Sequence, residues 1–182
     1  AWEAGAGLDF KAGQWTILHG GGGKRCFSIA SPPSDRTGIT YLIERTGAGG
    51  LSDWLHACKG GEPVEVRGPH GKFVVEAETL QPVLLIGFDT GISPVLSIVR
   101  SCPGIRALFG WGRPGEAPAV GIETAPADQV LARLPTLVRE GGFARIYLAG
   151  RIRYLDPAKR LLTEAGFPPD RVVEEPYDKP KA

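Results

Sequence analysis

The chain has 182 residues, of which 42% are hydrophobic, enough to build a packed core. Its 21 Lys and Arg residues nearly balance 20 Asp and Glu, and this net charge of +1 argues against a nucleic-acid-binding protein. No apolar run approaches the roughly 20 residues of a transmembrane segment.

The cysteines point away from a metal site. Cys26, Cys58 and Cys102 are far apart and form no Cys-x-x-Cys or Cys–His cluster, which argues against zinc or an iron–sulfur centre. We therefore expect no metal ligands. We also expect a soluble protein of a reducing compartment, such as the cytoplasm or an organelle interior.

The first part of the chain is predicted to be an antiparallel β-barrel. Short strand-like segments alternate with Gly, Pro and Asp, and closure into a barrel removes exposed strand edges. A short helix is expected at 53–57, with Ser52 as its N-cap. Strands are expected at 14–19, 26–30, 39–45, 63–67 and 72–75.

From Val83 onward, strands and helices alternate, which predicts a parallel sheet covered by helices. The apolar run 83–86 is typical of a strand buried on both faces. Ser93 and Pro94 are expected to cap and open the next helix. Further strands are expected at 105–109, 144–148 and 171–175, and a helix at 156–165 that ends before Gly166.

These two patterns predict two domains. Residues 76–81 are the expected linker, so that the barrel occupies 1–77 and the α/β domain 78–182. The fold class is therefore an antiparallel barrel followed by a parallel-sheet α/β domain.

One predicted strand carries a guanidinium, an aromatic ring and a hydroxyl in Arg25, Phe27 and Ser28. Arginine is well shaped to bind a pyrophosphate. An aromatic ring can stack on a flat ligand, whose polar edge a serine can bind. An ordinary barrel strand with a surface arginine and a core phenylalanine is the alternative on this segment alone.

A glycine-rich turn, Thr46-Gly47-Ala48-Gly49-Gly50-Leu51-Ser52, precedes the short helix. Such a turn exposes backbone N–H groups, and the helix dipole favours an anion beside them. A flexible turn without a ligand is the alternative. The combination with the Arg25 strand is rarer than either feature alone.

The order of these motifs resembles the ferredoxin–NADP reductase-like flavin reductase family. Its flavin signature, Arg-x-Tyr/Phe-Ser/Thr, is matched by Arg25, Phe27 and Ser28, and its Gly-x-x-Ser signature by Gly49 and Ser52. The segments VLLIGFDTGISPVLSIVR, LFGWGRPGE and IYLAGRIRYLDPAKRLL continue the resemblance, which covers about 8–177.

The resemblance implies a flavin-dependent oxidoreductase that passes electrons between NAD(P)H and an acceptor through FAD. The acceptor would be a separate electron acceptor or a larger protein assembly. No side chain is expected to act as a catalytic acid or base, because the cofactor supplies the chemistry. The cofactor-binding residues implied are Arg25, Cys26, Phe27, Ser28, Gly49, Gly50, Leu51, Ser52, Thr90, Gly91, Arg113, Gly150 and Tyr177.

The sequence departs from the family in the nicotinamide half. Phe88-Asp89-Thr90-Gly91 replaces Gly-Gly-Thr-Gly, and Ala149-Gly150-Arg151 replaces Cys-Gly-Pro. The barrel strands expected before Leu8 are short or missing. These departures favour an alternative, a non-catalytic or accessory subunit of a larger complex with an impaired nicotinamide site. A FAD-free protein-interaction module is a third interpretation.

The Phe88–Asp89 loop has three interpretations. Asp89 turns away and leaves a weakened site, its carboxylate occupies the helix terminus in place of a phosphate, or the loop is a packed, capped turn. Arg113 and Arg151 either bind a nucleotide or are solvated surface side chains. Tyr177 either resembles the family's aromatic at the flavin edge or simply follows a strand end.

Overall fold

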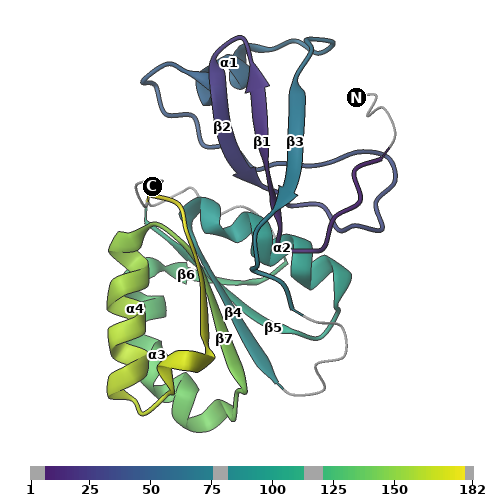
Figure 1. Cartoon of the computed structure of the whole chain (residues 1–182). Coiled ribbons are helices and arrows are strands. Elements are labelled where there is room, and N and C mark those ends of the chain that lie inside the picture. The colour runs from purple at the N-terminus through teal and green to yellow at the C-terminus, as the bar shows by residue number, and fades with distance from the viewer. Residues whose placement is uncertain (1–6, 76–81, 113–120, 179–182) are drawn as a thin grey trace.

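The computed structural model describes residues 7–75, 82–112 and 121–178, and these form two units (Figure 1). The N-terminal unit is a three-stranded antiparallel sheet in the order β2-β1-β3, with β1 at Trp15–Gly20, β2 at Gly23–Ser28 and β3 at Glu65–His70. Its short helix α1 spans Leu51–Ala57.

The predictions of two strands in this unit, 39–45 and 72–75, are wrong. Segment 39–45 makes only an isolated bridge, at Tyr41, because the Ser31 hydroxyl takes the Thr40 N–H at 3.0 Å. Segment 72–75 forms a local turn in which Val74 N–H donates to the Lys72 carbonyl at 2.9 Å. Side-chain and turn bonds thus replace the ladder bonds that the pattern predicted.

The C-terminal unit is a five-stranded parallel sheet in the order β6-β5-β4-β7-β8. The predicted succession of an antiparallel unit and a parallel α/β unit is confirmed. The strands are β4 Val83–Phe88, β5 Arg106–Trp111, β6 Glu123–Pro126, β7 Arg145–Gly150 and β8 Val172–Pro176. The helices are α2 Ile92–Ser101, α3 Ala127–Gly141 and α4 Ile152–Glu164, and the 3-10 turns are η1 Asp89–Gly91 and η2 Pro169–Arg171.

Helix boundaries differ from the expected ones. Helix α1 has Gly50 as its N-cap, and α2 has Gly91, so Ser52, Ser93 and Pro94 lie inside their helices instead of at the caps. Helix α4 begins at Ile152, four residues before the expected start. Strand β6 and helix α3 are additions that the sequence analysis does not contain.

The sheet of the C-terminal unit has a core on each face. Leu84, Ile86 and Phe88 pack beneath α3 and α4, whereas Val83 and Leu85 pack beneath α2. The alternate side chains of one apolar strand therefore serve both layers, as expected for a central parallel strand. Figure 1 shows α3 and α4 together at the left of the sheet.

The two units share a packed interface. Phe73 of the N-terminal unit is 1% exposed and lies in the α2-side core. From α2, Ser97 donates to the Ser31 carbonyl at 2.8 Å and Arg100 donates to the Ala30 carbonyl at 3.0 Å. The expected linker, 76–81, lies outside the described residues, so the boundary at 77/78 stays a prediction.

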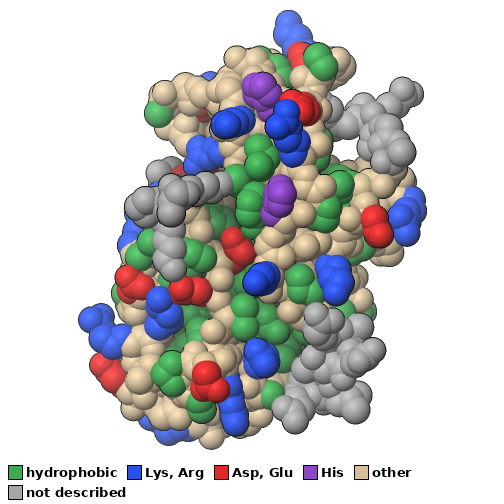
Figure 2. Space-filling model, viewed as in Figure 1, with side chains coloured by type: hydrophobic (Ala, Val, Ile, Leu, Met, Phe, Trp, Pro, Cys, Tyr) green, Lys and Arg blue, Asp and Glu red, His purple; other side chains and the backbone are tan. Residues whose placement is uncertain are grey.

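No helix of the described part of the chain combines the length and hydrophobicity needed to cross a bilayer. In Figure 2, Lys and Arg side chains are scattered over the visible face among Asp and Glu, in keeping with the balanced charge.

Candidate functional site

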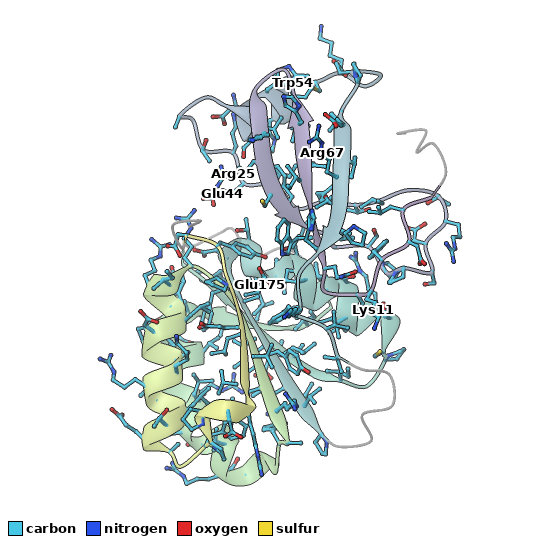
Figure 3. All side chains as sticks on the ribbon, in the orientation of Figure 1. Lys11, Arg25, Glu44, Trp54, Arg67 and Glu175 are labelled. Atoms are coloured by element: carbon cyan, nitrogen blue, oxygen red, sulfur yellow. The ribbon has the colours of Figure 1, made fainter. Side chains whose placement is uncertain are left out.

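A cavity of about 290 Å³ lies at the junction of the two units. Strand β2 contributes one wall, and the loop after β4 and the end of β8 contribute the opposite one. In Figure 3, Arg25 and Glu44 lie on the same side of the N-terminal sheet, above the strand that carries Glu175. The lining includes Trp15, Arg25, Cys26, Phe27, Ser28, Glu44, Ser52, Thr90, Ser93, Arg151, Glu175 and Tyr177.

Arg25 and Ser52, far apart in the sequence, meet in this cavity. Arg25 Nη1 donates to Ser52 Oγ at 3.2 Å, and Ser52 is only 2% exposed. This contact explains why Ser52 does not cap α1, because its hydroxyl is directed to the arginine. The pair presents a positive charge and a hydroxyl to the cavity, a combination suited to phosphate oxygens.

The glycine-rich turn is held by Asp53. Its carboxylate accepts N–H bonds from Thr46 at 3.0 Å, Gly47 at 3.0 Å and Gly49 at 2.7 Å. These bonds, that from Gly47 foremost, lower the pKa of Asp53 against the opposing effect of desolvation. Because the Gly49 amide is bonded to Asp53, it is not directed to a ligand.

The turn also packs against the β1–β2 hairpin. A Cβ on Gly22 would lie 2.6 Å from the Gly50 carbonyl, and a Cβ on Gly20 would lie 2.4 Å from the Trp54 ring. The glycines of the hairpin therefore allow the backbone of the turn and the Trp54 ring to approach closely. This contact fixes α1, and with it Ser52, relative to β2.

Tyr177 connects the end of the chain to both walls of the cavity. Its hydroxyl lies 3.0 Å from Ser28 Oγ and 3.3 Å from the Thr90 carbonyl. Burial raises the pKa of the Tyr177 phenol well above its ordinary value, with a smaller opposing effect from Ser28. The phenol is therefore a neutral hydrogen-bonding group that orients the Ser28 hydroxyl.

An ion pair crosses the same cavity. Arg151 Nη2 lies 2.7 Å from Glu44 Oε2, and the two side chains are 32% and 27% exposed. Glu44 belongs to the N-terminal unit, and Arg151 is the N-cap of α4. The pair therefore joins the two units directly, and a solvated surface arginine is the wrong interpretation of Arg151.

Phe88 does not block the loop. Its side chain is fully buried in the core, stacked on Tyr154 with ring centroids 5.2 Å apart. Space for the ring comes from Gly110, where an added Cβ would lie 2.6 Å from it, and from Gly150, where it would lie 3.0 Å from the Phe88 Cβ. The bulky side chain that replaces a glycine of the family pattern is thus part of the sheet packing.

Asp89 adopts a left-handed backbone with φ +49°, which is uncommon for a residue other than glycine. Its Oδ1 accepts the Gly112 N–H at 2.8 Å, and its Oδ2 accepts from Arg153 Nη2 at 3.0 Å. The Ile92 N–H donates to the Asp89 and Thr90 carbonyls instead. The carboxylate is directed to the end of β5 and the start of α4, which supports a capped turn over a phosphate substitute at α2.

A larger cavity of about 650 Å³ lies beside the loop. The Asp89–Arg153 pair forms part of its wall, with Arg153 the more exposed partner at 55% against 19% for Asp89. The remaining lining comes from both units and includes Tyr41, Leu42, Ile43, Glu44, Arg45, Leu55, His56, Thr90, Ile92, Phe109 and Trp111. The cavity is therefore flanked by aromatic rings and by two accessible arginines, Arg45 and Arg153.

The structure brings seven predicted site residues to the smaller cavity: Arg25, Cys26, Phe27, Ser28, Ser52, Thr90 and Tyr177. Five others do not line it: Gly49, Gly50, Leu51, Gly91 and Gly150. Leu51 is buried, and Gly91 packs so closely that a Cβ would lie 2.1 Å from the Ala149 carbonyl. The last of the thirteen, Arg113, lies outside the described residues.

Trp15 and Arg153 line the two cavities but were not expected from the sequence, and neither was the Glu44–Arg151 pair. For Arg153 the available signal was its position two residues after Arg151, in a segment that was not expected to be helical. Among the described residues, no cluster of three or more His, Cys, Asp or Glu is arranged to hold a metal.

Comparison with solved structures gives the fold. The ferredoxin reductase in carbazole 1,9a-dioxygenase aligns with 92% of this chain and 60% of its own, with a TM-score of 0.77 and 22% identity. The ferredoxin–NADP⁺ reductase of Plasmodium falciparum aligns with 92% of this chain and 84% of its own, with a TM-score of 0.76 and 15% identity.

Sequence comparison points the same way, although no protein-family model matches the chain. The ferredoxin–NAD(+) reductase component of the Xanthobacter autotrophicus alkene monooxygenase system is 31% identical over 173 residues, or 94% of this chain and 50% of the relative. Ferredoxin–NADP reductase B of Sorangium cellulosum is 34% identical over 96 residues, or 50% of this chain and 39% of the relative.

The chain is thus similar in sequence to ferredoxin–NADP reductases and to the reductase components of monooxygenases, and it shares the fold of ferredoxin reductases. The family resemblance is confirmed. The chain spans no more than 60% of the length of these curated relatives, from 27% for the terephthalate 1,2-dioxygenase reductase component 1 of a Comamonas species to 60% for the propane 2-monooxygenase reductase component of Mycolicibacterium goodii.

Proposed function

We propose that this chain, which shares the fold of ferredoxin reductases, binds FAD in the 290 Å³ cavity and passes electrons from NAD(P)H to an acceptor. The observation that carries the proposal is the meeting of Arg25, Phe27, Ser28 and Tyr177 around one cavity between the two units. The division into a flavin unit, 1–77, and a nucleotide unit, 78–182, is part of the proposal.

The residues of the cavity fit a flavin dinucleotide chemically. Arg25 and Ser52 provide a cation and a hydroxyl for the diphosphate. Phe27 and Trp15 provide aromatic faces for a flat ring system, and Ser28 provides a hydroxyl for its polar edge. Tyr177 fixes that hydroxyl from the opposite unit.

When bound, FAD accepts a hydride from a nicotinamide and releases electrons singly or in pairs. The protein's part is to bind and orient. Arg25 balances phosphate charge, and Tyr177 holds the Ser28 hydroxyl in place. No side chain of the cavity is required to transfer a proton.

The acceptor in this proposal is a separate protein or a larger assembly. Several similar proteins are named as reductase components of oxygenase systems, including the terephthalate 1,2-dioxygenase reductase component 1 of a Comamonas species. The three cysteines are free thiols, which supports a reducing compartment for this chain.

The test is an anaerobic absorbance spectrum of the purified, FAD-reconstituted protein before and after addition of NADH or NADPH. We expect flavin bands that bleach on addition of at least one nucleotide. A colourless preparation that takes up no FAD would overturn the proposal and favour a protein-interaction module.

A second candidate function is an accessory subunit that keeps the flavin without oxidising NAD(P)H. The Asp89 carboxylate, already bonded to Arg153 and Gly112, favours it because it places a negative charge beside the larger cavity, where this proposal places the pyridine nucleotide. This candidate predicts a yellow protein whose bands do not bleach with either nucleotide, whatever the incubation time.

A further inference from the structure

The Asp89–Arg153 pair is an unusual feature of the larger cavity. A left-handed backbone at a non-glycine residue is sterically costly and persists only where surrounding contacts impose it. At Asp89 those contacts are two hydrogen bonds made by the carboxylate, to the Gly112 amide at 2.8 Å and to Arg153 at 3.0 Å. The strain therefore positions a negative charge.

That charge lies against the groups that would otherwise attract an anion. Arg153 is fixed from two other directions, by the Tyr154 hydroxyl at 3.0 Å and by the Tyr154 ring, whose centroid is 4.6 Å from its Cζ. Its side chain is nevertheless 55% exposed at the wall of the 650 Å³ cavity. A dinucleotide entering this cavity meets a cation that already holds a carboxylate, and that carboxylate is fixed in turn by the Gly112 amide.

Resting on the proposed function, we propose that Asp89 is an internal anion that competes with the diphosphate of the pyridine nucleotide for Arg153. The residue thereby sets the affinity of the cavity, so that NAD(P)H binds weakly and leaves readily. The nucleotide can bind Arg153 only when the ion pair between Asp89 and Arg153 opens.

This competition occurs only if the ligand carries a phosphate and residue 89 carries a negative charge. Asp89→Asn removes the charge, keeps an oxygen for the Gly112 amide, and tolerates the left-handed backbone. We expect Asp89→Asn to bind ADP-ribose roughly tenfold or more tightly, which is the effect of one charge–charge interaction near a protein surface. Adenosine, which has no phosphate, should bind equally to both proteins.

The experiment is calorimetric titration of the FAD-reconstituted protein with ADP-ribose and with adenosine. Asp89→Gly serves as a second variant, because glycine relieves the backbone strain while also removing the carboxylate. The double variant Asp89→Asn/Arg153→Met should lose the increased affinity for ADP-ribose, and its affinity should lie within about threefold of that of the unmodified protein. The difference in ADP-ribose affinity between Asp89→Asn and the unmodified protein should also become smaller as the salt concentration is raised.

The inference is overturned if both Asp89 variants bind ADP-ribose no more tightly than the unmodified protein. Equal tightening for adenosine, or a gain that survives loss of Arg153, would overturn it as well. Nucleotide-dependent bleaching together with unchanged variant affinities would refute this inference alone. Absence of bound FAD in every protein would refute the proposed function and this inference with it.

Discussion

At the scale of single residues, hydroxyl groups at the junction are fixed by partners from distant parts of the chain. Ser52 is bonded to Arg25, and Ser28 to Tyr177, 149 residues away. Such contacts hold each hydroxyl in one orientation before a ligand arrives, which lowers the entropy lost on binding. Binding in the cavity therefore depends on groups that need not touch the ligand themselves.

Tyr177→Phe tests this positioning. Loss of one hydroxyl should weaken FAD binding about threefold to tenfold, since a hydrogen bond contributes about 0.5–1.5 kcal/mol. The control is Tyr41→Phe, which removes a bond of 2.8 Å to Thr16 outside the smaller cavity. Both variants should lower the free energy of unfolding similarly in a denaturant titration. Equal FAD affinities in the two variants would contradict the positioning role.

The same tyrosine predicts a pH dependence. Burial raises the pKa of Tyr177 in the folded protein, whereas the unfolded chain titrates near its ordinary value of about 10. The unfolded state therefore loses its proton first, and the free energy of unfolding should fall as pH rises above about 10. Denaturant titrations between pH 9 and 11 should show a shallower fall in Tyr177→Phe. An identical fall in both proteins would contradict the burial argument.

The direction of a side chain was the feature that sequence alone could not give. Phe88 and Asp89 replace two glycines, and whether they obstruct a ligand depends on contacts with other strands. Gly110 and Gly150 provide the space for the Phe88 ring, and Arg153 and Gly112 attract the Asp89 carboxylate. These partners are between 22 and 64 residues away in the chain, so no local pattern reveals them.

At the scale of elements, the glycine-rich turn depends on a carboxylate of the helix that follows it. Asp53 accepts three backbone N–H bonds from the turn, which replaces conformational freedom with a fixed shape. This fixed shape places Ser52 beside Arg25. The shape of the smaller cavity is therefore coupled to a residue that does not line it.

Asp53→Asn should loosen the turn, because the neutral amide has one acceptor oxygen for the N–H groups that the carboxylate held with two. We expect faster hydrogen exchange of the amides at 46–49 and weaker FAD binding. The matched control is Glu62→Gln, since Glu62 holds the amides of Lys59 and Gly60 in a separate turn. The control should speed exchange locally and leave FAD affinity unchanged. Unchanged exchange at 46–49 in Asp53→Asn would refute this account of the turn.

The elements themselves were predictable where hydrophobic pattern dominates. Strands β4, β5 and β7 appear as apolar runs because both of their faces are buried. Helix α3 was not expected because Pro135 interrupts its apolar pattern, and α4 was expected too late because Pro157 lies inside it rather than at its start. Packing on the sheet stabilises both helices despite the lost hydrogen bond at proline.

At the scale of the whole molecule, the two units form one packed structure. Buried Phe73 and the bonds from α2 hold the N-terminal unit against the sheet, and the Glu44–Arg151 pair closes the junction across the smaller cavity. A cavity with walls from both units keeps its shape only if the units keep their relative position. The sequence indicated two units, but not this pair between them.

A double-mutant cycle measures the contribution of the pair. Glu44→Gln and Arg151→Gln should show a coupling of about 0.5–1 kcal/mol in the free energy of unfolding, smaller at high salt. The control pair is Glu123 and Arg133, which lies within the C-terminal unit and is more exposed. Only the Glu44 and Arg151 variants should alter FAD affinity. Zero coupling between them would show that the pair does not join the units energetically.

The most direct test of the central claim is titration of the FAD-free protein with FAD and with riboflavin. Arg25→Met should weaken FAD binding roughly 10- to 100-fold, because a hydrogen bond to a charged group contributes about 1.5–3 kcal/mol, while riboflavin affinity stays nearly constant. Arg67→Met, on the same sheet but 68% exposed and paired with Glu65, should bind FAD as the unmodified protein does. Equal FAD affinities for Arg25→Met and the unmodified protein would contradict the account.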